Sequence, residues 1–300
     1  MRISTSLFYS QANSAMTTLG ERAGLLQTQI STQKRLAAPS SDAVAYRQLS
    51  SLGRAGADAT QNAKNVDLAS TLLTASDSAL ASIEEQLQQA RDMAIQANSG
   101  TLPADQRNTI ATALDAMIED LLKLVNTPDT NGAPLFGGAS GNTAYVQAPD
   151  GTISYVGTGT PSAIPIGDGA SVRATVTGDE VFSNLTRADG STTDMFAILQ
   201  GLSASLHAGS DAGTAIDDIK TALDAIGNAR ASVGARGARL DLESQRLADA
   251  ALAREETRSG LEDTDISAAI IELQKTMTVL QATQASFTRL SSLSLFDYLR

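Results

Sequence analysis

The sequence contains no cysteine and no tryptophan, and His207 is the single histidine among its 300 residues. Without cysteine the chain forms no disulfide, carries no thiolate nucleophile and offers no thiolate ligand to a metal. A zinc site built on several histidines is excluded too, because only one histidine is present. We therefore expect no metal site.

Aromatic side chains and positive charge are also scarce. Aromatics make up 4% of the chain, and the formal net charge at neutral pH is −11. Because phosphate binding needs a concentrated basic surface, this balance argues against nucleic acid as a partner. Much of the apolar content is alanine and leucine, which form helices readily. Long helices are therefore favoured over a compact, enzyme-like core.

Long hydrophobic runs are missing as well. The first twenty residues are interrupted throughout by serine, threonine, glutamine and asparagine. We therefore expect no membrane partner, no membrane span and no cleaved signal peptide. A cytoplasmic protein fits this pattern, and so does one exported by a route that reads no such signal.

What the sequence does contain is a strong heptad pattern, with apolar residues at alternating steps of four and three. The pattern predicts a first helix that ends near Pro39, with Ser40, Ser41 and Asp42 capping the next helix. Gly100 ends the second helix, and Gly260 breaks the long penultimate one before Thr264 and Asp265 cap the last. The predicted seams are Ala12, Met16, Leu19, Ala23, Leu26 and Ile30; Val66, Ala69, Leu73, Ser76, Leu80, Ile83, Leu87, Ala90, Ala94 and Ala97; Ile219, Ile226, Val233, Leu240 and Leu247; and Ile266, Ile270, Leu273, Met277, Leu280, Gln284 and Phe287.

The composition changes between residues 127 and 183, which are rich in Gly, Thr, Pro and Asp. Two Asp-Gly pairs, at 150–151 and 168–169, stand beside the short runs ISYV and SVRATV, a pattern typical of hairpins. We therefore predict a mainly α fold of long, nested, antiparallel coiled-coil helices with a small β-rich insertion. The expected domains are residues 1–42 with 260–300, residues 43–130 with 190–259, and residues 131–189.

No catalytic chemistry emerges from the sequence. Paired acids such as Glu84-Glu85 point about 100° apart on a helix and do not share a site. The Gly-rich segments lack the strand–glycine–helix order that cradles phosphate, so we expect no cofactor. His207 falls at the end of a predicted helix, where it can interact with the helix dipole. We therefore predict a protein that is not an enzyme.

Four stretches carry a family resemblance: RLAAPSSDAVAYRQL (35–49), NAKNVDLASTLLTASDSALASIEEQLQQARDMAIQANSGT (62–101), LFGG (135–138) and TDISAAIIELQKTMTVLQATQASFTRLSSLSLFDYL (264–299). Together they resemble the flagellin superfamily of bacterial axial proteins. The start MRISTSLFYSQANSAM and the ending SLSLFDYL resemble the branch at the hook–filament junction more than the filament flagellins. After Pro39 the chain has the more polar SSD where flagellins have two acids, which leaves the cap argument unchanged.

The resemblance implies a structural role in the flagellum, as an extracellular ring of identical copies that joins hook-associated protein 1 to flagellin. It also implies export through the flagellar channel, with a flagellar export chaperone bound to the C-terminal segment. Two alternatives stay open: a filament flagellin, and a secreted helical adhesin or effector.

The first and last helices bury only one stripe each, so other chains must cover their remaining apolar faces. We expect residues 1–40 and 262–300 to be marginal or disordered alone and to order on assembly. The predicted assembly interface comprises Leu7, Met16, Leu19, Leu26, Ile30, Ile270, Leu273, Met277, Leu280, Phe287, Leu293, Leu295, Phe296, Tyr298 and Leu299.

Overall fold

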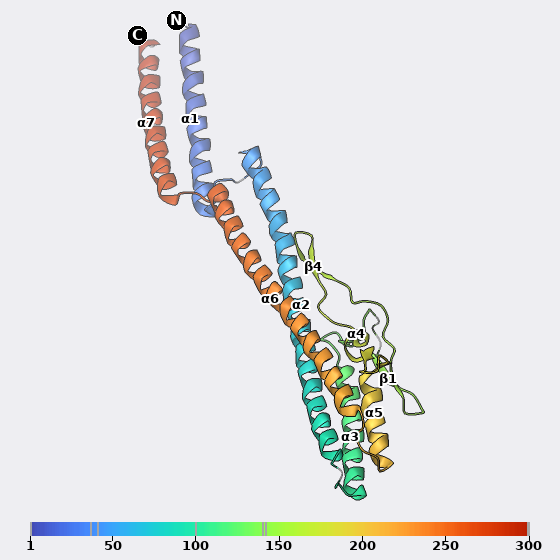
Figure 1. The fold of residues 1–300 in the computed structure, drawn as a ribbon. Coiled ribbons are helices and arrows are strands. Elements are labelled where there is room, and N and C mark those ends of the chain that lie inside the picture. The colour runs from blue at the N-terminus through green and yellow to red at the C-terminus, as the bar shows by residue number, and fades with distance from the viewer. Residues whose placement is uncertain are drawn as a thin grey trace. The chain divides into compact units, whose positions relative to one another are not determined.

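The computed structural model describes residues 2–36, 38–40, 42–99, 101–139, 141 and 143–298 (Figure 1). Within these residues the chain forms seven helices and three two-stranded antiparallel sheets, as the predicted mainly α class requires. It divides into two compact units, Met1–Asp58 with Asp249–Arg300, and Ala59–Ala248. The finer division into three domains stays a prediction.

The first unit is built on α1 (Arg2–Thr32) and α7 (Ile266–Tyr298), which lie side by side in Figure 1. An ion pair of 2.8 Å joins Arg22 to Glu272, and the rings of Tyr9 and Phe287 meet edge to face at 5.3 Å. Tyr9 lies earlier than Arg22 in α1, whereas its partner Phe287 lies later than Glu272 in α7. The two helices therefore run antiparallel. The unit also holds the start of α2 (Ala43–Ala97) and the end of α6 (Ala215–Glu262).

The first helix ends earlier than the sequence pattern predicts, at Thr32 instead of near Pro39. Gln33 has a φ of 59°, a left-handed conformation that cannot continue a right-handed helix. The predicted caps are confirmed at two helix starts. The Asp42 carboxylate accepts hydrogen bonds from the amides of Val44 and Ala45, and the Asp265 carboxylate accepts one from the amide of Ala268. The penultimate helix continues two residues beyond Gly260, to Glu262.

The predicted seam on α7 is wrong at alternate positions. Leu273, Leu280 and Phe287 are half-buried as predicted, but Ile270 and Met277 are 41% and 43% exposed. The buried positions are instead Ala269 and Thr276, one residue earlier. Small side chains allow the two helices to approach closely, so the bulky residues beside them turn outward.

The second unit is organised around the remaining lengths of α2 and α6. All ten predicted seam residues from Val66 to Ala97 are buried, and so are the five heptad residues of α6 from Ile219 to Leu247. Arg230 lies on α6 between the buried heptad residues Ile226 and Val233. Its guanidinium donates to Asp77 at 2.9 Å and to Glu84 at 2.7 Å. Helices α3 (Ala104–Val125) and α5 (Met195–His207) pack against each other in the same core.

The β-rich insertion consists of three hairpins and a short helix. These are β1 (Tyr145–Gln147) with β2 (Ile153–Tyr155), β3 (Ile164–Gly167) with β4 (Ala170–Val172), β5 (Leu185–Thr186) with β6 (Thr192–Thr193), and α4 (Gly178–Phe182). The strand expected in ISYV is found as β2, whereas β4 shares only Ser171 and Val172 with the expected run SVRATV. An aromatic core of Phe136, Tyr145, Phe182 and Phe196 holds the insertion together, with ring centroids 5.2–6.2 Å apart.

The second hairpin is fastened to the long helices of its unit. Asp168 and Gly169 form its turn with positive φ values of 45° and 72°. Arg246 of α6 reaches the Asp168 carboxylate at 2.6 Å, and the Asn65 amide of α2 donates to the Pro165 carbonyl at 2.8 Å. No helix in the described part of the chain is long and apolar enough to cross a membrane.

Candidate assembly surface

The clearest unpartnered surface in the structure is apolar and lies on α7. Ile266, Ile270, Ile271, Met277 and Val279 are exposed there, Ile271 by 66%. On α1, Leu7 and Leu25 are exposed by 57% and 51%. In a pair of helices, each helix buries one stripe against the other, and the rest of its surface stays exposed to solvent. These seven residues lie on more than one side of the helix pair, and together we call them the outer apolar face.

The predicted interface residues fall into four groups in the structure. Leu26 is buried against the helix pair; half-buried are Met16, Leu19, Ile30, Leu273, Leu280 and Phe287; exposed are Leu7, Ile270 and Met277; and Leu293, Leu295, Phe296, Tyr298 and Leu299 lie outside the residues whose side chains the structure describes. The half-buried group serves the contact between α1 and α7. The exposed group remains available to another chain.

Four residues of the outer apolar face, Leu25, Ile266, Ile271 and Val279, are absent from the predicted interface. Ile266 lies on the predicted seam of the last helix, whereas the other three sit beside a heptad position and not on it, so the spacing of the seam passes over them. The signal that finds them is the width of the apolar surface, because isoleucine and valine on both sides of a seam exceed what one helix contact covers.

The segment after α1 and the segment before α7 meet at a corner formed by residues 33–35 and 261–264, which positions this surface. Lys34 and Asp263 form an isolated antiparallel bridge. The amide of Arg35 donates to the Glu262 carbonyl at 2.7 Å, and the amide of Thr264 donates to the Gln33 carbonyl at 3.0 Å. The segment that leaves α1 is thereby bound to the segment that enters α7.

Ionic contacts reinforce the corner. The Lys34 ammonium lies 2.5 Å from one carboxylate oxygen of Glu262, and Arg258 lies 2.5 Å from the other. The Glu262 side chain is only 14% exposed. The hydrogen bond from Lys34, followed by that from Arg258, holds the pKa of Glu262 below its ordinary value of 4.5. This carboxylate is therefore charged and fully paired at neutral pH.

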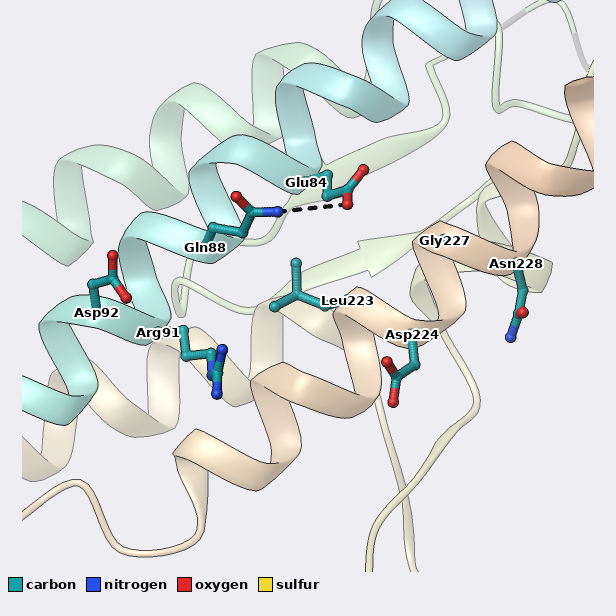
Figure 2. A pocket seen from close by; sticks show the side chains of 8 residues that line it. All are labelled: Glu84, Gln88, Arg91, Asp92, Leu223, Asp224, Gly227 and Asn228. Carbon is teal, nitrogen blue, oxygen red and sulfur yellow. Dashed lines mark hydrogen bonds between the residues drawn. The ribbon is translucent and has the colours of Figure 1, made fainter.

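An open groove of about 790 Å³ lies between α2 and α6 in the second unit (Figure 2). It is lined by Glu84, Gln88, Arg91, Asp92, Leu223, Asp224, Gly227 and Asn228. Figure 2 shows the Gln88 amide donating to Glu84. Lys220 holds Asp224 at 2.8 Å and Arg230 holds Glu84 at 2.7 Å. These two carboxylates are engaged by cations, and no Ser, Thr, Cys, Lys, His or Tyr side chain among the described residues lines the groove.

His207 takes part in a contact between α3 and α5 that the sequence could not reveal. Its Nε2 lies 3.0 Å from Asp115 and its Nδ1 lies 2.5 Å from Asn108. The Ser203 hydroxyl donates to the other oxygen of Asp115 at 2.5 Å. The carboxylate therefore stands between hydroxyl and imidazole, whereas nucleophile activation needs the imidazole on the hydroxyl. The arrangement ties two helices together.

Comparison with known proteins gives the family. The N-terminal helical region of bacterial flagellin matches residues 3–141, and the C-terminal helical region matches residues 216–299. The chain belongs to the bacterial flagellin family. No group of three or more metal-ligating side chains is found among the described residues.

Relatives within the flagellin family favour its junction branch. Flagellar hook-associated protein 3 of Escherichia coli K12 is 30% identical, covering 99% of both chains. Flagellin of Listeria innocua is 23% identical, covering 97% of this chain and 95% of its own. The predicted resemblance to the hook–filament junction proteins is therefore confirmed over the filament alternative.

Solved structures share the fold. A putative flagellar hook-associated protein from Vibrio parahaemolyticus aligns with a TM-score of 0.68 at 20% identity, covering 74% of this chain and all of its own. The flagellar junction protein FlgL from Legionella pneumophila aligns with a TM-score of 0.61 at 15% identity, covering 72% and 100%. The nested helices of the flagellin family, with a β-rich insertion, are thus a known architecture.

Proposed function

We propose that this chain is a structural adaptor of the bacterial flagellum, assembled as a ring that joins the hook to the filament. The observation that carries the proposal is the outer apolar face, on a chain whose full-length relatives include hook-associated protein 3. Neighbouring copies cover this face laterally. Hook-associated protein 1 meets the ring on one side and flagellin on the other.

The energetics favour this use of the surface. Complete burial of an isoleucine, leucine or methionine contributes about 1.5–3 kcal/mol. The residues of the outer apolar face are already partly covered, so their further burial supplies on the order of several kcal/mol per subunit. Part of this gain is offset by the cost of ordering and orienting the subunit.

The proposal includes an extracellular location, reached through the flagellar export channel without a cleaved signal peptide. An export chaperone holds the C-terminal helical segment until assembly. The chain acts through geometry and carries out no reaction.

The test is assembly of purified chains on hook and filament fragments. The unsubstituted chain should add a limited layer to hook ends that carry hook-associated protein 1 and should then accept flagellin. Ile271→Asp should reduce this addition at least tenfold because it places a charge on the outer apolar face. Gln281→Asp, which changes an exposed polar residue of the same helix, should leave addition unchanged.

Growth without limit on filament fragments would support a filament flagellin instead. Absence of any addition to either end, by a chain that remains folded, would favour the secreted helical protein. Deletion of residues 262–300 should abolish both attachment and chaperone binding, and retained motility in cells carrying that deletion would contradict the adaptor.

A further inference from the structure

The corner at residues 33–35 and 261–264 contains more specific contacts than a connection between helices requires. Two main-chain hydrogen bonds flank the bridge between Lys34 and Asp263, one of 2.7 Å and one of 3.0 Å. Thr32 is the last residue of α1, and α7 begins at Ile266. The bridge therefore fixes the point where α1 ends relative to the point where α7 begins.

Side chains from three directions fasten the same corner. The Arg35 guanidinium donates to the Leu261 carbonyl at 2.8 Å, and the Gln29 amide of α1 donates to the Arg35 carbonyl at 3.1 Å. Arg258 of α6 pairs with Glu262, and Ser259 hydrogen-bonds to Asp263. The corner thus links the end of α1, the end of α6 and the entry to α7.

The low exposure of Glu262 separates this corner from an ordinary surface ion pair, although the Lys34 and Arg258 side chains are themselves 52% and 40% exposed. Lys220 and Asp224 form a similar pair within α6, but their side chains are 62% and 64% exposed. Exposed pairs of that kind contribute about 0–1 kcal/mol. Glu262 is largely covered, so its loss of water must be offset by Lys34 and Arg258. Removing one cation leaves a partly uncompensated charge.

We infer that residues 33–35 and 261–264 form a latch that sets the register of α1 against α7 in the single chain. Arg22–Glu272 and Tyr9–Phe287 are specific contacts along the pair, whereas the alanines and leucines of the seam can pack in a similar way after a shift of one heptad. The latch supplies this register from one end. Its consequence for assembly, a preformed outer apolar face, rests on the proposed function, whereas the latch itself is a property of the chain alone.

Acid should open the latch. The charged groups that meet at Glu262 are Lys34 and Arg258, with Arg35 and Asp263 beside them. The pKa of Glu262 is depressed in the folded chain, so the contact is complete above the ordinary value of 4.5 and is lost as the pH falls through the folded pKa.

The absence of cysteine makes a direct test possible. Gln27→Cys on α1 and Lys275→Cys on α7 place two exposed spin labels on the full chain, and electron resonance measures the distance between them. We expect a narrow distance distribution at pH 7. The double variant Lys34→Met/Glu262→Gln should widen it at least twofold, whereas Lys34→Arg, which keeps the charge, should keep it narrow.

Three further outcomes complete the test. The control Lys220→Met/Asp224→Asn should leave the distribution unchanged. Reversible acidification through the folded pKa of Glu262, which lies below 4.5, should widen it in the otherwise unsubstituted chain and produce no further widening in the Glu262→Gln chain. An unchanged width in the double variant, or equal widening by Lys34→Arg, would overturn the latch. Neither result depends on whether the chain assembles, so failure here is distinct from failure of the adaptor function.

Discussion

Tyr145 shows how one residue organises the β-rich insertion. Its ring contacts Tyr155, Phe182 and Phe196, and its hydroxyl donates to the Gly178 carbonyl at 3.0 Å. A Cβ on Gly178 would lie only 2.7 Å from the Tyr145 ring, so a glycine is needed for this approach. Burial raises the pKa of Tyr145 above its ordinary value of 10.0, against the smaller opposing effect of its hydrogen bond with Ser183.

The shift predicts a specific alkaline behaviour. Tyr145→Phe should lower the free energy of unfolding by about 1 kcal/mol at pH 8, because the Gly178 carbonyl loses the hydroxyl that donates to it. Above pH 10 the unfolded chain ionises Tyr145 while the folded chain keeps it neutral, so the tyrosine form loses stability as the pH rises. The gap between the two chains should therefore shrink by up to about 1.4 kcal/mol per pH unit.

Urea unfolding at pH 8, 10 and 11 measures this gap. Comparison of the two chains at each pH cancels the titration of lysines and other tyrosines that they share. A gap that stays constant from pH 8 to pH 11 would contradict the burial of an un-ionised hydroxyl.

At the scale of helices, the pairing of α1 with α7 depends on small residues. Ala269 of α7 is buried, and Thr276 is buried one heptad later, in a unit where α7 contacts α1. Ala269→Leu should force the helices apart and destabilise the first unit by about 1–3 kcal/mol. Ser267→Leu adds the same volume at an exposed position of α7 and should change the free energy of unfolding by less than about 0.5 kcal/mol.

Thermal unfolding followed by circular dichroism distinguishes these two chains. The Arg22–Glu272 contact offers a local reporter, because separation of the helices should also break this ion pair. Equal stability of Ala269→Leu and Ser267→Leu would show that the outward turn of Ile270 and Met277 has another cause.

The sequence predicts the buried positions more accurately on α2 than on α7. On α2, heptad spacing alone identifies ten of the twelve buried positions among the described residues and misses Ala45 and Ala79. On α7 apolar residues surround the seam, and Ile270 competes with Ala269 for the same role. The heptad prediction therefore selects Ile270 and Met277 instead of Ala269 and Thr276. It favours the more hydrophobic side chain and takes no account of how closely two helices must approach.

Contacts between distant segments were beyond the sequence for a different reason. The bridge of Lys34 to Asp263 and the pairing of Asp115 with His207 join residues more than 90 positions apart. The sequence around a lysine, an aspartate or a histidine does not indicate which distant residue it will contact. The predicted assembly surface shares this limit, since heptad spacing passes over Leu25, Ile271 and Val279.

At the scale of the whole chain, the nested order of helices brings the two ends of the sequence into one unit. Met1–Asp58 and Asp249–Arg300 form the first unit, and the continuous segment Ala59–Ala248 forms the second. Closing a loop of 190 residues would cost on the order of 5 kcal/mol for a free chain. Folding of the second unit removes most of this cost before α1 meets α7.

This order predicts how protection from amide exchange is distributed in the chain before assembly. The amides of Arg35 and Thr264 donate within the latch and should exchange slowly even in the dilute chain. Protection along α1 and α7 should fall with distance from the latch, because the latch anchors the helix pair at one end and local opening becomes easier toward the other. Assembly should raise protection at the far ends of both helices, while α3 of the second unit serves as an internal reference.

Hydrogen exchange read by mass spectrometry, before and after addition to hook ends, measures this gradient. Uniform strong protection of α1 and α7 in the dilute chain would contradict the expectation that these helices are marginal alone. Rapid exchange at Arg35 and Thr264 would instead contradict the latch. The combination that we expect, a protected corner and exchanging ends, describes a chain whose helix register is set before its partners arrive and whose outer surface becomes stable only when they do.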